Sequence, residues 1–391
     1  MKTILMIGGG LQEIEAARCI KANGYKLAIT DRNPDSPCKE YADYFLNFDG
    51  NDAAGITEYI LNNSEEIGIC GVFTLTELVI TVAKVASNLG LPSVGVESAI
   101  ACQDKSVSKE FWLKNNIPTP NGTVFEKLSE VEDFFHEYNN VFVKPIKGFG
   151  GIGAGKINSK KALNDFFSEN DIGKYIVEEV CEGPMIDVNG YFDENGRFNG
   201  LGCFEREFIS DKVIESNAYY PCQRGDKIVK EAYRLTEAAC RALNITWGPV
   251  KSDLVLTKSG LKVFEVAPRL HGPKGTLYLT SFIHEKNHLE MILPLIIGEV
   301  FKVEDSLNSN KIAGFCLIDS PKKAYDEITN LDILDHYNCK TLIFKSTADK
   351  PIDYTTSADV IGYIFAAAES KAELIEVLNK VNTIIDFKNT L

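Results

Sequence analysis

The alternation of short apolar runs with helical segments over the first 95 residues constrains the fold of this chain more than any other feature. The runs Thr3–Ile7, Lys26–Thr30 and Ile69–Phe73 have the composition of buried strands, and residues 12–23 and 76–89 have helical character and are each followed by a glycine. Parallel strands need a crossover connection between them, which is usually a helix. This order therefore predicts an α/β fold that begins with a Rossmann-like, doubly wound parallel sheet.

The first predicted strand ends in the glycine turn Gly8–Gly10. A dinucleotide fingerprint that begins at Gly8 requires a glycine at position 13, where this chain has Glu13. Asp31 does lie about where a ribose-binding acid would be found. NAD binding is therefore a weaker interpretation of this turn than a glycine turn shaped for another ligand or for chain geometry alone.

Composition excludes several functional classes. The chain has 391 residues, and its 55 acidic and 41 basic residues give a net charge of −14, which disfavours unspecific binding to nucleic acids or anionic membranes. No apolar run approaches the ~18 residues of a membrane span, and the apolar start is too short for a signal peptide. These two observations favour a cytoplasmic location. In such a chain the ten scattered cysteines, which include no Cys-x-x-Cys pair, are expected to be reduced and mostly buried thiols.

Further elements are predicted in the second half of the chain. Residues 185–192, 198–205, 253–257 and 261–266 have strand character, and residues 227–243 have helical character. The length allows two or three domains.

The segment VKPIKGFGGIGAGKI, residues 143–157, nearly contains the phosphate-binding motif G-x-x-x-x-G-K-[ST]. That motif needs a hydroxyl after the lysine to hold magnesium, and this chain has Ile157 there. Residues 141–144 alternate like a strand, so the glycines are expected at the tip of a hairpin. Their bare N–H groups can form an anion-binding concavity over the phosphates of a nucleotide, within reach of Lys144. A plain flexible turn with an exposed lysine is the alternative.

Two carboxylates are expected to face each other on a second hairpin. Asp253 and Glu265 flank the turn at residues 257–260 and come close to opposite each other when the strands pair. Side-by-side acids repel unless a cation lies between them, and magnesium favours a few carboxylates together with substrate phosphates. Arg269 follows and could clamp a carboxylate or a phosphate with two hydrogen bonds. Two unrelated surface acids are the alternative.

The segment from His284 to His288 matches the zinc-protease motif H-E-x-x-H. That chemistry requires both histidines on one continuous helix. Asn287 instead has the character of a cap for a helix that begins at His288, and no third ligand is evident, so the zinc interpretation is weak.

Taken in order, these motifs resemble the ATP-grasp superfamily, and within it the branch of carbamoyl-phosphate synthase, biotin carboxylase, the purine-pathway carboxylases and amino-acid ligases. The segment MKTILMIGGGLQEIEAARCIKANGYKLAITDRNPDSPCKEYAD is especially similar to the start of the pyrrolysine-pathway ligase and its relatives. DKSVSKEFWLKNNIPTP resembles the segment with the first nucleotide lysine, VKPIKGFGGIG the second lysine and the lid, and IVEEVCEG the adenine hinge. SDLVLTKSGLKVFEVAPR resembles the metal hairpin with its arginine, and SADVIGYIFAAAESKAELIEVLNKVNTIIDF resembles the closing domain.

The resemblance implies a domain order and a set of site residues. It implies a Rossmann-like pre-ATP-grasp domain at 1–95, an ATP-grasp domain at 96–305 with a lid at about 118–185, and a small α+β domain at 306–391. Residues 308–311 themselves have the character of a linker. It implies ATP and Mg²⁺ or Mn²⁺ as cofactors. The implied residues are Lys105 and Lys144 for phosphates, Gly148, Gly150, Gly151 and Gly153 for the lid, Glu178, Glu179 and Cys181 for adenine, Asp253 and Glu265 for the metal, Arg269 and Lys144 for catalysis, and Arg269, His271, Arg206 and Glu77 for substrate.

The function implied is an ATP-dependent carboxylate–amine ligase that forms an amide through an acyl phosphate, acting on amino-acid-like small molecules. A bicarbonate-activating carboxylase or carbamoyl-phosphate-type enzyme is the alternative within the fold, and an ATP-binding protein without ligase activity is the alternative outside it. Relatives of this kind are often dimers, so a homodimer is an assembly that the resemblance allows.

The chain departs from the family pattern at three positions. Ala267 replaces the asparagine of Glu-x-Asn, which removes one metal ligand. Met185 stands where a glutamate usually holds the ribose, and His271 stands where glycine is common. The number of metal ions, the way the ribose is held and the shape of the substrate pocket are left open by these departures.

Overall fold

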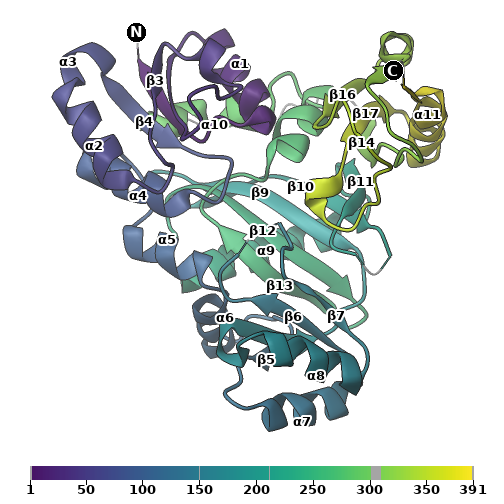
Figure 1. Cartoon of the computed structure of the whole chain (residues 1–391). Helices are drawn as coiled ribbons and strands as arrows, with labels where there is room; N and C mark the ends of the chain where they lie inside the picture. Colours follow the sequence, from purple (N-terminus) through teal and green to yellow (C-terminus); the bar gives the residue numbers. More distant parts are fainter. Residues whose placement is uncertain (1, 149, 211, 301–309, 390–391) are drawn as a thin grey trace.

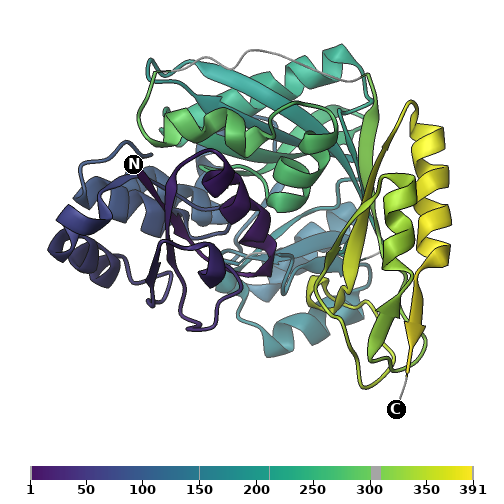
Figure 2. The same cartoon turned by 90° about the horizontal axis from the view of Figure 1, so that it is seen from above.

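The structure is a computed structural model, and it describes residues 2–148, 150–210, 212–300 and 310–389. Three larger sheets organise the chain (Figure 1): an N-terminal parallel sheet, a long central antiparallel sheet, and a small antiparallel sheet below it. Figure 2 shows the N-terminal unit and the last helix, α11, on opposite sides of the molecule. No helix among the described residues is long and apolar enough to cross a membrane.

The N-terminal sheet has four parallel strands in the order β3-β2-β1-β4, which confirms the Rossmann-like prediction. Its buried faces are Ile/Leu-rich because helices cover a parallel sheet on both sides. The elements are β1 (Thr3–Ile7), α1 (Ile14–Ala22), β2 (Lys26–Thr30), β3 (Tyr44–Leu46), α2 (Ala53–Asn62), α3 (Ser64–Ile67), β4 (Ile69–Phe73) and α4 (Val79–Asn88).

The glycine turn after β1 is occupied by the chain's own carboxylates. The N–H of Gly9 donates to Asp31 Oδ2 at 2.9 Å, and the N–H of Gly8 donates to Thr30 O at 3.0 Å. Glu13 is folded back against the turn, where burial raises its pKa to about 7. A dinucleotide phosphate would have to displace these acids, so the turn has the character of a structural element.

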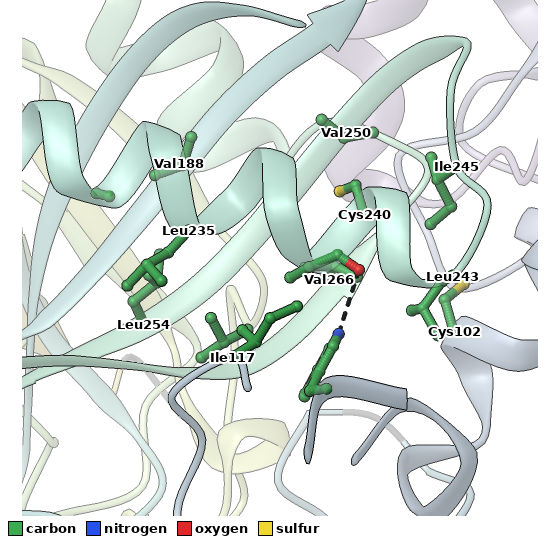
Figure 3. Packing of buried hydrophobic residues seen from close by; sticks show 14 of the residues in the cluster. Cys102, Ile117, Val188, Leu235, Cys240, Leu243, Ile245, Val250, Leu254 and Val266 are labelled. Atoms are coloured by element: carbon green, nitrogen blue, oxygen red, sulfur yellow. Dashed lines mark hydrogen bonds between the residues drawn. The ribbon is translucent and has the colours of Figure 1, made fainter. Parts of the chain in front are cut away.

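The central sheet has eight antiparallel strands in the order β13-β12-β9-β10-β11-β14-β17-β16. One face packs against the amphipathic helix α9 (Asp226–Ala242), and Figure 3 shows part of this core, with Val188, Leu235, Leu254 and Val266 in one cluster. The strands are β9 (Met185–Phe192), β10 (Phe198–Phe208), β11 (Glu215–Tyr220), β12 (Gly248–Thr257), β13 (Gly260–Ala267), β14 (Ile312–Leu317), β16 (Lys340–Ile343) and β17 (Gly362–Ala368).

The C-terminal strands extend this same sheet, since β14 pairs with β11 and β17 pairs with β14. Helix α11 (Lys371–Ile384) covers them, and a two-stranded sheet of β15 (Glu327–Thr329) and β18 (Asp386–Lys388) lies at the end of the chain. The predicted domain boundary at 305/306 and residues 308 and 309 of the predicted linker at 308–311 lie outside the described residues. The three domain ranges stay a prediction.

The small sheet has the order β5-β8-β6-β7 and is covered by α7 (Leu128–Tyr138) and α8 (Lys160–Glu169) through a core that includes Val131, Leu163 and Val177. Strands β6 and β7 form an antiparallel hairpin, which confirms that the glycines lie at a hairpin tip. The strands are β5 (Gly122–Thr123), β6 (Val141–Pro145), β7 (Gly155–Ile157) and β8 (Tyr175–Glu179). Two helices, α5 (Val96–Gln103) and α6 (Lys105–Lys114), connect this unit to the N-terminal one.

The H-E-x-x-H segment is not one helix. Helix α10 (His288–Ile296) begins at the second histidine, and the side chain of Asn287 caps it by accepting from Glu290 N at 3.0 Å. Both histidine rings hydrogen-bond the hydroxyl of Tyr220, His284 Nε2 at 2.5 Å and His288 Nε2 at 3.1 Å. The sequence expectation of a helix start at His288 is confirmed, and the two rings take part in a buried hydrogen-bond network.

Candidate functional site

One face of the central sheet carries a row of ionisable side chains. In the register of the strands, Asp253 on β12 pairs with Glu265 on β13 and with Asp187 on β9. Paired residues of antiparallel strands point to the same face, so these three carboxylates lie side by side on the face opposite α9. The predicted neighbourhood of Asp253 and Glu265 is therefore confirmed.

A lysine lies between the two predicted metal ligands. Lys251 Nζ is 2.6 Å from Glu265 Oε1 and 3.0 Å from Asp253 Oδ2, and its side chain is only 5% exposed. Burial alone would lower the pKa of Lys251, but the two carboxylates outweigh burial and raise it above its ordinary value. The sequence analysis missed Lys251, although its spacing of two residues from Asp253 places it on the same strand face.

A second group of charges adjoins the acid pair around Arg206. Its guanidinium contacts Asp187, Glu215 Oε1 at 2.5 Å, and Asp253 Oδ1 at 3.5 Å. His271 lies against the same acids, with Nε2 3.4 Å from Asp253 Oδ1 and Nδ1 3.7 Å from Asp187 Oδ2. One ligand atom from each of Asp187, Asp253 and His271 lies within 4.8 Å of the others. Arg206, predicted to bind substrate, is thus engaged by the chain's own carboxylates.

The first predicted phosphate lysine lies at the start of α6 and faces the lid. Asp104 caps the helix by accepting from Ser106 N at 3.1 Å and Val107 N at 3.2 Å, which fixes where Lys105 emerges. Lys105 Nζ donates to Gly148 O at 2.7 Å, and partial burial lowers the pKa of its ammonium. Lys105 therefore ties the helix to the beginning of the glycine loop.

A pocket of about 160 Å³ brings the two halves of the predicted site together. Its walls include Lys105 and Gly148 from the lid side, Glu265 and Ala267 from the hairpin, and Glu77 from the N-terminal unit. Lys147 and Gln103 also line it. Four predicted site residues, Glu77, Lys105, Gly148 and Glu265, therefore border one cavity. Ala267, which departs from the family pattern, borders it as well.

The second predicted phosphate lysine is held by a buried glutamate. Lys144 Nζ lies 2.7 Å from Glu178 Oε2, and Lys109 Nζ lies 2.7 Å from Glu178 Oε1. Burial acts to raise the pKa of Glu178, but the two ammonium groups outweigh it and lower that pKa. Lys144 also lies over the ring of Phe264 at 5.7 Å, next to Glu265. Lys109 was missed, though it follows Lys105 by one helical turn.

The predicted adenine hinge follows β8 directly. Glu179 Oε1 accepts from Lys262 Nζ at 2.5 Å and from Asn121 N at 2.7 Å. Cys181 is half-buried just beyond the strand. The carboxylates of Glu178 and Glu179 are thus paired with lysines, and backbone contacts from this segment to adenine stay a prediction.

The two predicted substrate residues Arg269 and Glu77 form an ion pair between the N-terminal unit and the segment after β13. Arg269 Nη1 also donates to Leu270 O at 2.9 Å, while its buried Nε has no hydrogen-bond partner among the described residues. Arg269 is only 7% exposed, so this donor departs from the usual pairing of buried polar groups, and the role of Arg269 in substrate binding stays a prediction.

The glycines of the predicted lid adopt backbone conformations that favour glycine. Gly150, Gly151 and Gly153 have φ of +63°, +71° and +72°. A Cβ on Gly151 would lie 2.4 Å from Val213 Cγ1, and Gly150 O accepts from Ser357 Oγ at 3.2 Å. The loop therefore packs against the β10–β11 connection and against the C-terminal segment.

Comparison with known proteins was made for the whole chain. A family model described as the ATP-grasp domain matches residues 102–273. The 3-methyl-D-ornithine–L-lysine ligase of Methanosarcina mazei is 29% identical over 307 residues, which are 78% of this chain and 74% of that protein. The D-alanine–D-alanine ligase of Corynebacterium urealyticum is 25% identical over 224 residues, 52% of this chain and 61% of that protein.

Solved structures share the fold over the full length. The L-amino acid ligase from Bacillus licheniformis aligns with a TM-score of 0.85 and 18% identity, covering 100% of this chain and 99% of its own. The N5-carboxyaminoimidazole ribonucleotide synthetase from Thermotoga maritima aligns with a TM-score of 0.76 and 21% identity, covering 99% of each chain.

Proposed function

We propose that this chain, whose residues 102–273 match the ATP-grasp domain, is an ATP-dependent carboxylate–amine ligase acting on amino-acid-like small molecules. The observation that carries the proposal is the pocket of about 160 Å³, whose lining includes Lys105, Gly148, Glu265 and Glu77. Glu77 in turn forms an ion pair with Arg269. Phosphate-binding cations, a lid and acids for a metal ion are the parts that phosphoryl transfer requires.

The acid pair fits a divalent cation. Asp253 Oδ1 is buried and accepts no hydrogen bond among the described residues, and Glu265 lies beside it in register. Hard cations such as Mg²⁺ or Mn²⁺ favour such oxygen donors together with phosphate oxygens. Asp253 and Glu265 would hold the ion, which neutralises phosphate charge when bound.

The proposed reaction has two steps. A carboxylate oxygen of the first substrate attacks the γ-phosphorus of ATP, forming an acyl phosphate and releasing ADP. The amine of the second substrate then attacks the acyl carbon, phosphate leaves, and the amine nitrogen loses a proton as the amide forms. Lys105, Lys144 and Arg269 stabilise negative charge on the transferred group, and the glycine lid excludes water that would hydrolyse the acyl phosphate.

The proposed substrate class is supported by three of the four proteins named above, which are named as ligases of amino acids, and by the charges near the pocket. Glu77 offers a carboxylate for an ammonium group, and Arg269 offers a guanidinium for a carboxylate. His271 borders the same face. Arg206, surrounded by Asp187, Glu215 and Asp253, is proposed to orient the carboxylates of the site instead of contacting substrate itself.

The test is ADP release by the purified chain with ATP, Mg²⁺ and pairwise mixtures of amino acids, with mass spectrometry of the products. The proposal expects ADP and an amide in equal amounts for at least one pair. ADP formation that depends on bicarbonate alone would favour the carboxylase alternative, and nucleotide binding without ADP from any mixture would contradict a ligase.

We place the protein in the cytoplasm, a proposal supported by the ten cysteines, all of which are free thiols. Its expected partners are small molecules, and a homodimer stays a prediction that sedimentation of the purified chain can test.

A further inference from the structure

The β12–β13 hairpin carries a lysine, Lys251, next to its acid pair of Asp253 and Glu265. Lys251 is the direct cross-strand partner of Ala267, just as Asp253 is the partner of Glu265. All four side chains point to one face, so the small methyl group of Ala267 leaves the space along which Lys251 extends. The lysine ammonium ends between the two carboxylates, within hydrogen-bond distance of both.

The hydrogen bonds of Lys251 use one oxygen of each acid. They engage Asp253 Oδ2 and Glu265 Oε1, which leaves Asp253 Oδ1 and Glu265 Oε2 as donors for a metal ion. Asp253 Oδ1 accepts no hydrogen bond among the described residues, although Arg206 Nη2 lies 3.5 Å and His271 Nε2 3.4 Å from it. With the lysine in place, the three groups together carry one net negative charge. That arrangement suits one divalent ion alongside a nucleotide, while a second ion would meet the ammonium at close range and find no ligand at Ala267.

We propose that this protein binds a single divalent cation with its nucleotide and that the Lys251 ammonium takes the place of a second one. Phosphoryl-transfer sites often use two divalent ions to neutralise the phosphates. Here a fixed side chain supplies part of that positive charge, so the requirement for free metal is lower. This inference rests on the proposed function, because it assumes that a nucleotide binds at the acid pair.

Titration with Mn²⁺, followed by electron paramagnetic resonance of the free ion, tests the proposal in the presence of a saturating non-hydrolysable ATP analogue. The wild-type chain is expected to bind one Mn²⁺ per bound nucleotide. The double variant Lys251→Met/Ala267→Asn, which removes the ammonium and supplies a ligand, is expected to bind two. Lys258→Met, which changes an exposed lysine in the turn of the same hairpin, is the matched control and is expected to bind one.

Two Mn²⁺ ions per nucleotide in the wild-type chain would overturn the proposal, because Lys251 would then have been displaced by metal. A folded double variant that binds the analogue with one Mn²⁺ would equally overturn the role given to the lysine. The wild-type stoichiometry decides the main point even if the double variant does not fold. A chain that binds no ATP analogue at all contradicts the proposed function itself, which is a different result.

Discussion

Single residues in this site act mainly through charge that is paired inside the protein. Buried ions are stabilised only when partners satisfy them, and the removal of one partner leaves the other uncompensated. Lys251 with its two acids, and Glu178 with its two lysines, are both arrangements of this kind. Each fixes the position of a group that the proposed chemistry needs.

Substitution of the acid pair tests the proposed metal site. Asp253→Asn and Glu265→Gln keep the shape of each side chain but remove its charge. Loss of charge stabilisation in a phosphoryl-transfer site costs on the order of 100-fold in kcat or more, so ligase turnover should fall by at least that factor. ADP release at increasing Mn²⁺ measures it. Glu65→Gln on the exposed surface of α3 is the control, and an unchanged rate in both site variants would contradict the assignment.

The pKa of Glu178 predicts a dependence of stability on pH. In the folded chain its pKa is below the ordinary value of 4.5, so its contribution to stability is present above about pH 4.5 and is lost as the pH falls through the folded-state pKa. Glu178→Gln also leaves the ammonium groups of Lys109 and Lys144 without their carboxylate partner. We expect a loss of about 3–5 kcal/mol near pH 7 and a smaller difference from wild type near pH 4.

Thermal melting of wild type and Glu178→Gln at several pH values measures this difference. Glu126→Gln, at an exposed position in the same small-sheet unit, is the control and should melt like wild type. A Glu178→Gln deficit that stays constant at pH values well below 4.5, for as long as wild type stays folded, would show that ionisation of this carboxyl does not contribute as described.

At the scale of elements, two hairpins and one helix bring the site together. The register of the β12–β13 hairpin places Asp253 opposite Glu265, and the β6–β7 hairpin positions the predicted lid. The capped start of α6 positions Lys105, which hydrogen-bonds to Gly148. The β6–β7 hairpin, which is the predicted lid, contains left-handed glycines and contacts both the β10–β11 connection and the C-terminal segment.

Gly151→Ala tests the lid as an element. The new methyl group would lie against Val213 on a backbone with φ of +71°, so the loop must shift. We expect ADP to exceed amide product, since a displaced lid admits water to the acyl phosphate. The ADP-to-product ratio measures the uncoupling. Gly24→Ala, with φ of +79° and open space around its Cβ, carries a similar backbone strain far from the lid and should leave the ratio at one. A ratio of one in both variants would contradict the lid role.

At the scale of the whole molecule, three sheets converge on one cavity. The N-terminal unit contributes Glu77, the small sheet contributes Gly148 of the predicted lid, and the central sheet contributes Glu265 and Ala267. The Glu77–Arg269 ion pair links the first and last of these, and the C-terminal strands continue the central sheet beside them. The arrangement of these units therefore decides whether Arg269 can reach substrate.

A double-mutant cycle on Glu77→Gln and Arg269→Lys tests this link. Each change alone should lower kcat/KM for the carboxylate substrate, Arg269→Lys by about 100-fold or more, because the guanidinium is proposed to bind the transferring group. Residues in direct contact couple by about 0.5–3 kcal/mol, so the double variant should lose less than the sum of the single losses. Additive losses would contradict a shared role. Arg234→Lys, in the exposed pair with Glu231, is the control.

The local order of the chain was predictable wherever backbone periodicity or turn chemistry decides it. The strands Thr3–Ile7, Ile69–Phe73 and Met185–Phe192 have the predicted bounds, the helix start at His288 follows from its cap, and the glycine hairpin follows from its glycines. The predicted facing of Asp253 and Glu265 is confirmed, but the turn alone does not produce it. The register that starts at the turn pairs Leu254 with Val263, and a β-bulge between Asp253 and Leu254 then shifts the pairing by one residue so that Asp253 lies opposite Glu265.

Packing between distant segments determined the partners of the buried charged side chains, which the sequence motifs did not predict. The sequence by itself determined the parallel N-terminal sheet, the two hairpins and the residue types of a nucleotide site, because neighbours along the chain set those features. Only the tertiary structure placed Lys251 between the acids, paired Glu178 with Lys109 and Lys144, enclosed Arg206 among carboxylates and joined Glu77 to Arg269. The partner of a buried charge is chosen by side-chain reach across strands and units, and most of these pairs join segments that lie far apart in the chain.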